Sequence, residues 1–189
     1  MRPIKKLDIS LLVRPEDILE GLAFLESHYQ RAFGVSPSSP DYLLTAREAG
    51  DIVGTIGVNF GSADRGLRLA RLYIFDHAHA PLPIDFERTV EFGKWVSEVI
   101  GVSAALVHAA ICFSLSEGKA YAWCEHTAAL NRVCQRFGII FHKVADAQLD
   151  RSQIEEHHRK FYENNDVQLY MFDLYQAHKA LRKYLDIVA

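Results

Sequence analysis

The chain has 189 residues, of which 49% are hydrophobic and 11% aromatic, so we expect one folded domain, 1–189, with its own apolar core. The formal net charge of −3 gives no electrostatic reason to expect nucleic acid as a partner. The most apolar stretch, 100–115, is interrupted by Gly101, His108 and Ser114, which excludes a membrane-spanning helix there. The basic start, 1–6, precedes charged residues instead of an apolar run, so we expect no export signal and a cytoplasmic location.

Three cysteines, Cys112, Cys124 and Cys134, stand in apolar or helix-forming surroundings. An odd number without paired spacing does not indicate a disulfide framework. We therefore expect three reduced thiols, most of them buried.

The first half of the chain predicts a helix, a hairpin and a third strand. Apolar residues recur every three or four positions from Pro15 to Phe33, and a glycine follows, which is typical of an amphipathic helix. Two segments rich in β-branched and aromatic residues, 42–47 and 52–60, flank a predicted turn at 48–51. A further strand is predicted over 67–75.

The second half alternates strands with helices. A proline-bearing loop, 76–83, precedes a strand predicted over 87–98 and ending near Trp95. Ser103 is placed to cap a helix that ends at Glu117-Gly118. Later predicted elements are a charged surface helix over 148–165, a closing strand over 167–174 and a terminal amphipathic helix over about 176–189.

The segment 119–143 carries the clearest local pattern. It predicts a buried strand from Lys119, a helix over 128–137 and a second strand after the helix. Thr127 can accept hydrogen bonds from the first helical turn, and Gly138 permits the left-handed backbone that ends a helix. The whole order of elements predicts an α/β (α+β) fold, a mixed central sheet flanked by helices.

The pattern Thr127…Leu130…Cys134…Gly138-Ile139 resembles the Asn-x-x-Ala-x-x-Leu-Tyr-x-x-x-Gly-Phe signature near the C-terminus of GNAT-type N-acyltransferases. The resemblance implies a GNAT-like acyltransferase fold. Thr127 stands where the signature has asparagine. Cys134 stands where it has the tyrosine that often serves as general acid, so Cys134 is the residue at the catalytic proton-donor position.

Residues 42–174 resemble the GNAT-fold branch that contains the acyl-homoserine lactone (autoinducer) synthases, the N-acyl amino acid synthases and the thermostable-hemolysin family. The likeness rests on Gly54-x-x-Gly57, on Val90-Glu91-Phe92-Gly93-Lys94 and on Phe161-Tyr162-Glu163. In that branch the glutamate that matches Glu91 helps to deprotonate or orient the acyl-accepting amine. Such a base is needed because an amine is protonated at neutral pH. The alternative is a solvated Glu91, or one paired with Arg71 or Lys94.

The resemblance also implies that the pantetheine arm of the acyl donor binds where two parallel strands separate, here 87–96 and 119–124. The residues expected to bind it are Phe92, Gly93, Lys94, Trp95, Gly101, Ser103, Trp123 and Cys124. Acetyl-CoA users of this fold carry a (Gln/Arg)-x-x-Gly-x-(Gly/Ala) loop that binds pyrophosphate at a helix N-terminus. This chain has one glycine and a glutamate in the matching segment, 97–104. An acyl carrier protein presents the pantetheine arm without the nucleotide, so the weak phosphate loop favours it as the acyl donor. Acyl-CoA is the other possible donor. We expect no tightly bound cofactor.

A carrier-protein donor needs a basic docking surface. Two clusters are candidates, with ordinary solvated charge as the competing interpretation: Arg65, Arg68 and Arg71, and Lys179, Arg182 and Lys183. The autoinducer-synthase pattern also expects acidic residues for an adenosyl donor near the N-terminus. Asp41 is the one candidate between Phe33 and Arg47, so we expect an amino acid or another small amine as the acceptor.

Two other kinds of site compete with this interpretation. His77-x-His79 and His157-His158 are zinc-type ligands, but they come from distant segments and nothing completes a ligand set, so we expect no metal. Cys124 and His126 share one strand face and could form a thiol nucleophile pair, although a buried free thiol is commoner.

The sequence thus predicts an N-acyltransferase that moves an acyl group from acyl carrier protein or acyl-CoA to a small-molecule amine or amino acid. The alternative is a non-catalytic module of the same fold that binds acyl groups or carrier protein, which Cys134 and the weak phosphate loop favour. A membrane-active protein is disfavoured because the chain has no strongly cationic amphipathic helix.

Overall fold

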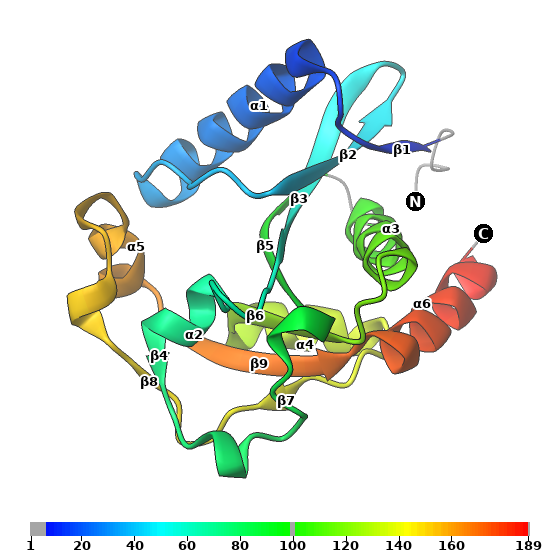
Figure 1. Ribbon diagram of the computed structural model, residues 1–189. Helices are drawn as coiled ribbons and strands as arrows, with labels where there is room; N and C mark the ends of the chain where they lie inside the picture. The colour runs from blue at the N-terminus through cyan, green and yellow to red at the C-terminus, as the bar shows by residue number, and fades with distance from the viewer. Residues whose placement is uncertain (1–6, 99–100, 189) are drawn as a thin grey trace.

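The computed structural model describes residues 7–98 and 101–188 (Figure 1). The strands are β1 (Leu7–Leu11), β2 (Tyr42–Glu48), β3 (Asp51–Phe60), β4 (Tyr73–Ile74), β5 (Thr89–Ser97), β6 (Tyr121–Thr127), β7 (His142–Lys143), β8 (Gln148–Leu149) and β9 (Val167–Asp173). The helices are α1 (Pro15–Phe33), α2 (Arg68–Leu72), α3 (Val102–Ser116), α4 (Ala128–Arg136), α5 (Arg159–Asn164) and α6 (Leu174–Val188). None of these helices is long and apolar enough to cross a membrane.

Seven strands form one mixed sheet in the order β1-β2-β3-β5-β6-β9-β7, and β4 pairs with β8 in a small second sheet. Helices α3 and α6 pack on one face of the large sheet, over alternate strand residues such as Ile56, Val90 and Ala122. Helix α1 packs on the opposite face, where a Cβ on Gly21 would lie 2.6 Å from the side chain of Leu12. The expected mixed sheet flanked by helices is confirmed (Figure 1).

The β5–β6 pair is the one parallel pair among the described strands. The two strands are paired from Thr89 opposite Tyr121 to Phe92 opposite Cys124. Beyond these residues β5 continues to Ser97 and β6 to the end of its own strand, but the two no longer pair with each other. The strands therefore separate within the region that the sequence assigned to the acyl donor.

A β-bulge bends β5 at the start of its separated half. The register between β3 and β5 shifts by one residue between Thr55 and Gly57, and Lys94 has a φ of +54°. Few residues other than glycine adopt this left-handed conformation, and a bulge redirects the side chain that it carries. The bulge thus sets the direction of the Lys94 side chain.

The prediction for 119–143 is confirmed in its main features. The Thr127 hydroxyl accepts a hydrogen bond from the Leu130 backbone N–H at 3.4 Å, and α4 begins at the next residue after Thr127. Gly138 follows the helix with a φ of +79°. The strand expected after it shortens to the two residues of β7, paired with β9.

The strand predicted over 67–75 is wrong, because its centre is the helix α2. Leu69 and Leu72 are three residues apart and both are buried, which suits one face of a helix. The Glu91 carboxylate also accepts a hydrogen bond from the Leu69 backbone N–H at 3.0 Å. That partner lies on a distant strand, so local propensity could not reveal it.

The helix predicted over 148–165 is also wrong over most of its length. Its first residues form β8, which pairs with β4, and the Asp150 side chain accepts a hydrogen bond from the Ser152 backbone N–H to make a turn. Helical structure is confined to short 3-10 turns and to α5.

Two smaller differences concern the start of α3 and an additional strand. The N-cap of α3 is Gly101, with a φ of +99°, and Ser103 lies inside the first turn. Strand β1 was not predicted, and it pairs with β2 at the edge of the sheet. Residues 1–6, on which the expectation about export rests, and 99–100 of the predicted phosphate loop lie outside the described residues.

Candidate functional site

A cavity of about 360 Å³ lies where β5 and β6 separate. Its size is within the range of small-molecule sites. Helices α1 and α5 close it from one side, through Tyr29 and Phe161, and Val107 of α3 reaches it from the other face of the sheet. The apolar side chains that line it are Phe33, Val35, Ile56, Leu69, Phe92, Trp95, Val107, Leu130, Phe141, Phe161, Val167 and Phe172.

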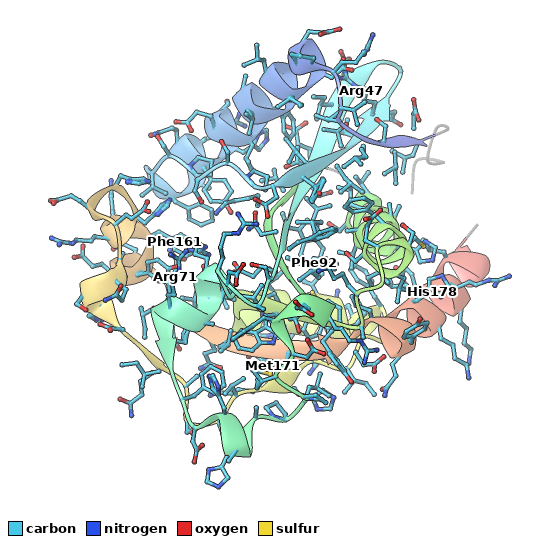
Figure 2. The ribbon with its side chains drawn as sticks, viewed as in Figure 1. Arg47, Arg71, Phe92, Phe161, Met171 and His178 are labelled. Atoms are coloured by element: carbon cyan, nitrogen blue, oxygen red, sulfur yellow. The ribbon has the colours of Figure 1, made fainter. Side chains whose placement is uncertain are left out.

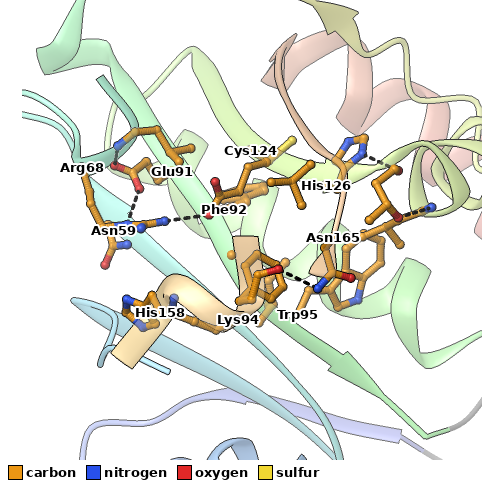
Figure 3. A pocket seen from close by; sticks show the side chains of 18 of the residues that line it. Asn59, Arg68, Glu91, Phe92, Lys94, Trp95, Cys124, His126, His158 and Asn165 are labelled. Atoms are coloured by element: carbon orange, nitrogen blue, oxygen red, sulfur yellow. Dashed lines mark hydrogen bonds and ion pairs between the residues drawn. The ribbon is translucent and has the colours of Figure 1, made fainter. Parts of the chain in front are cut away.

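One wall of the cavity carries a guanidinium between two carboxylates (Figure 3). Arg68 Nη2 donates to Glu125 Oε1 at 3.1 Å, and Arg68 Nε lies 3.6 Å from Glu91 Oε1. The Glu91 side chain is 3% exposed and that of Glu125 is 15% exposed. Buried charges of this kind require partners, and Arg68 supplies one positive charge for both acids.

Glu125 is held by hydroxyl groups as well as by Arg68. Tyr162 Oη donates to it at 2.8 Å, and Tyr73 Oη at 3.2 Å. Burial raises the pKa of Tyr162 and of Tyr73, and the neighbouring Glu125 raises them further, so both phenols remain protonated donors. Sequence reasoning missed Glu125, although a glutamate inside a strand of buried residues was the available signal.

Glu91, the residue that the sequence proposed as the base, lines the cavity and is buried. Burial raises the pKa of its carboxyl group, and this effect is opposed by Arg68 and by the Leu69 backbone N–H. A carboxylate with a raised pKa is a better proton acceptor near neutral pH. Its ion-pair partner is Arg68, and neither Arg71 nor Lys94, the two partners considered from the sequence, pairs with it.

Lys94 brings a second positive charge to the cavity. Burial lowers its pKa to about 8, and the nearby Arg68 lowers it in the same direction. Its Nζ lies 5.9 Å from the ring centroid of Tyr29. Among the described residues no carboxylate forms an ion pair with it. Lys94 thus faces the cavity without an ion-pair partner among the described residues, and the more distant Glu125, Glu91 and Glu155 raise its pKa without offsetting burial (Figure 3).

Cys124 and His126 both line the cavity, but neither is in an activated state. Burial raises the pKa of the Cys124 thiol well above its usual value. Burial also lowers the pKa of His126 to about 4, and its ring stacks on Tyr170 with centroids 4.1 Å apart. A nucleophilic pair needs a thiolate, whereas this environment favours a neutral thiol and a neutral imidazole.

The structure brings together six of the ten residues that the sequence proposed for the site: Glu91, Phe92, Gly93, Lys94, Trp95 and Cys124. The other four, Gly101, Ser103, Trp123 and Cys134, are not among the residues that line the cavity. Cys134 is fully buried, and burial raises its pKa to about 12. Trp123 packs in the core beside Phe75 and Phe86.

The remaining candidates from the sequence are spread over the molecule. Arg68 is only partly exposed and lines the cavity, and it also lines a second pocket together with Arg71, whereas Arg65 lines neither. Exposed positions on α6 are occupied by Lys179, Arg182 and Lys183. Asp41 hydrogen-bonds the backbone N–H of Phe60. Within the described residues, the possible metal-ligand groups do not join His77 and His79 with His157 and His158.

No protein-family model matches the chain, and no curated protein matches its sequence significantly. Solved structures do resemble it along nearly its whole length. BjaI, a CoA-dependent acyl-homoserine lactone synthase with SAM and isopentyl-CoA, has a TM-score of 0.66 at 16% identity, covering 96% of this chain and 90% of BjaI. The acyl-homoserine lactone synthase LasI has a TM-score of 0.64 at 11% identity, covering 94% and 95%.

FeeM, an N-acyl amino acid synthase from uncultured soil microbes, has a TM-score of 0.62 at 11% identity, covering 91% of this chain and 93% of FeeM. Identities this low establish the fold and not the substrates. The chain has the GNAT-type acyltransferase fold, as do autoinducer synthases and an N-acyl amino acid synthase.

Proposed function

We propose that the protein is an N-acyltransferase that moves an acyl group from a pantetheine thioester to a small amine bearing an anionic group. The observation that carries the proposal is the placement of Glu91, Arg68 and Lys94 on a largely apolar cavity, which Glu125 also lines, at the separation of β5 and β6. An amine acceptor needs a base, a thioester needs an extended binding site, and the cavity offers both.

The donor would lie between the separated strands. Residues 93–96 of β5 and 125–127 of β6 do not pair with each other, while β3 and β9 bond their outer edges. Backbone groups that point from these residues into the gap between β5 and β6 could therefore bond the amide groups of a pantetheine arm. The acyl chain would enter the apolar part of the cavity, where Phe92, Phe141 and Phe172 supply much of the wall. Coenzyme A and acyl carrier protein present the same arm, so both are donors to test.

Glu91 would act as the general base, directly or through one water molecule. Its Oε2 accepts the Leu69 N–H, while Oε1 is 3.6 Å from Arg68 and keeps a lone pair for the incoming proton. Glu91 first takes a proton from the acceptor ammonium and passes it to solvent. The freed amine nitrogen then bonds to the thioester carbon, its second proton passes to Glu91, and the C–S bond breaks to release the thiolate, which is protonated by solvent. Arg68 orients Glu91 for this step, and Cys134 has no part in it.

Lys94 would bind the anionic group of the acceptor. A buried cation without a counter-ion is unfavourable in the free protein, and an acceptor carboxylate would supply the missing charge. This argument favours amino acids over amines that lack a carboxylate. Tyr29 of α1 lies beside Lys94, and residues of α5 line the same cavity, so both helices could help to enclose such a ligand.

The test measures thiol release and product mass with acyl-CoA and acyl-carrier thioesters, using amino acids and their decarboxylated amines as acceptors. We expect Glu91→Gln to lower kcat about 100-fold, within the range for loss of a general base, whereas Glu163→Gln, at an exposed glutamate, leaves it unchanged. Lys94→Met should raise the KM for amino acids about tenfold or more and leave the KM for decarboxylated amines unchanged. Lys143→Met, at an exposed lysine, is its matched control.

Two results would contradict the proposal. Retention of an acyl thioester without amine-dependent thiol release would make the protein a binding module. Full activity of Glu91→Gln would remove Glu91 from its role as the base, even if the transfer reaction itself is observed.

A further inference from the structure

Three metal-binding side chains meet between α3 and α6, away from the residues that line the cavity. His108 and Cys112 are four residues apart on α3 and therefore lie on the same face of that helix. His178 comes from α6, and Figure 2 shows it on the part of α6 that lies near α3. One ligand atom from each residue lies within 4.8 Å of the other two.

The distances between these groups are close to those around a tetrahedral ion. Cys112 Sγ is 3.7 Å from His108 Nε2. Zinc bonds of about 2.3 Å to sulfur and about 2.0 to 2.1 Å to nitrogen place two such ligands about 3.6 Å apart at a tetrahedral angle. The His108 and His178 ring centroids are 5.0 Å apart, near the spacing of about 5 Å that two imidazoles on one such ion would have. The two rings are nearly parallel, with 16° between their planes, so side-chain rotations are needed to direct all three ligand atoms at one centre.

The types of ligand atom indicate which metals the group can bind. Two imidazoles and a thiolate are ligands for zinc and similar transition-metal ions, whereas magnesium and calcium require oxygen ligands. No carboxylate belongs to this group, so it differs from the exposed cluster of Glu155, His157 and His158. Cys112 is the one exposed cysteine of the three, so an ion can reach it from solvent.

We propose that His108, Cys112 and His178 bind a zinc ion, with solvent or another ligand in the fourth position. On binding, the Cys112 thiol loses its proton to solvent as the Zn–S bond forms. The ion would join the C-terminal helix α6 to α3, the helix that also places Val107 in the cavity wall. The sequence did not reveal this site because Cys112 and His178 are 66 positions apart and no short motif connects them.

The test uses the full chain, freed of metal, and Co²⁺ as a spectroscopic probe that Zn²⁺ then displaces. We expect one Co²⁺ per chain, with a thiolate-to-cobalt absorption band that Cys112→Ser abolishes. His178→Asn should weaken binding about tenfold or more, whereas His157→Gln, in the other cluster, should leave it unchanged. A missing band, or the same band in Cys112→Ser, would overturn the proposal.

A second readout works on the unaltered protein, so it does not depend on whether the variants fold. Iodoacetamide should modify Cys112 far faster than the buried Cys124 and Cys134, and Zn²⁺ should slow modification of Cys112 at least tenfold. Zinc should also raise Tm by several degrees in the unaltered protein and not in Cys112→Ser. Equal modification rates with and without Zn²⁺ would refute the site whatever the result of the acyl-transfer assays.

Discussion

The paired and the separated halves of β5 and β6 differ in what surrounds their side chains. In the paired half, Val90, Ala122 and Trp123 are at most 1% exposed and pack into hydrophobic clusters on the two faces of the sheet. In the separated half, Lys94 and Glu125 face a cavity, and the groups that line it only partly neutralise their charges. We infer that the paired half, apart from the buried Glu91, stabilises the fold, while the separated half holds groups whose burial costs free energy. Such a division is common where a rigid scaffold carries a functional site.

The largest effect should come from the paired half. Trp123→Ala removes a fully buried aromatic side chain and should lower the free energy of unfolding by about 4 kcal/mol. Trp95→Ala, in the separated half, removes the same chemical group from a partly exposed position and should cost about half as much. Urea unfolding followed by circular dichroism measures both. Equal losses would mean that the two halves contribute alike to stability.

Removing the shared counter-ion should give the next largest effect. Arg68→Met leaves Glu91 and Glu125 without their positive partner and should destabilise the protein by about 3 kcal/mol at neutral pH. Without Arg68 the pKa of Glu91 in the folded state rises further above its unfolded value, so the folded state binds the proton more tightly. The stability of the variant should therefore fall as pH rises from 5 to 8. Arg151→Met, at an exposed arginine, should show no such pH dependence.

Lys94 offers a prediction of the opposite sign. Lys94→Met removes a buried cation without a counter-ion and should raise the free energy of unfolding by about 2 kcal/mol at pH 7. The folded pKa of Lys94 is lowered to about 8 from an ordinary value of 10.5, so between these pH values the unfolded state binds more protons. The unaltered protein should therefore gain stability over that window, and the variant should not.

Urea midpoints at pH 7 and pH 10 test this prediction, with Lys143→Met as the control that stays within about 0.5 kcal/mol of the unaltered protein. If Lys94→Met is less stable than the unaltered protein at pH 7, the charge of Lys94 does not destabilise the folded state.

The smallest expected effect concerns the end of β6. Thr127 caps α4 through its hydroxyl group, so Thr127→Ala should cost about 1 kcal/mol, and Thr127→Ser should keep most of the stability. Thermal unfolding of the two variants compares them directly. Similar losses for serine and alanine would show that the methyl group, and not the cap, matters at this position.

Local signals in the sequence determine a large part of this fold. The 3.6-residue period of α1, the hairpin of β2 and β3, and the cap and glycine around α4 act over a few residues, so they can be read without a structure. The resemblance of 90–94 to the acyltransferase pattern also located Glu91, Lys94 and the region where the strands separate.

Tertiary structure alone decided which groups meet. Arg68 and Glu125 are 57 residues apart, and α2 owes its first turn in part to the Glu91 carboxylate. The same holds for Lys94, whose direction depends on a bulge between β3 and β5, and for His178, which reaches Cys112 because α6 packs on α3. The physical reason is that periodicity, caps and turns depend on neighbouring residues, whereas burial, ion pairing and pKa depend on partners that only the completed sheet brings together.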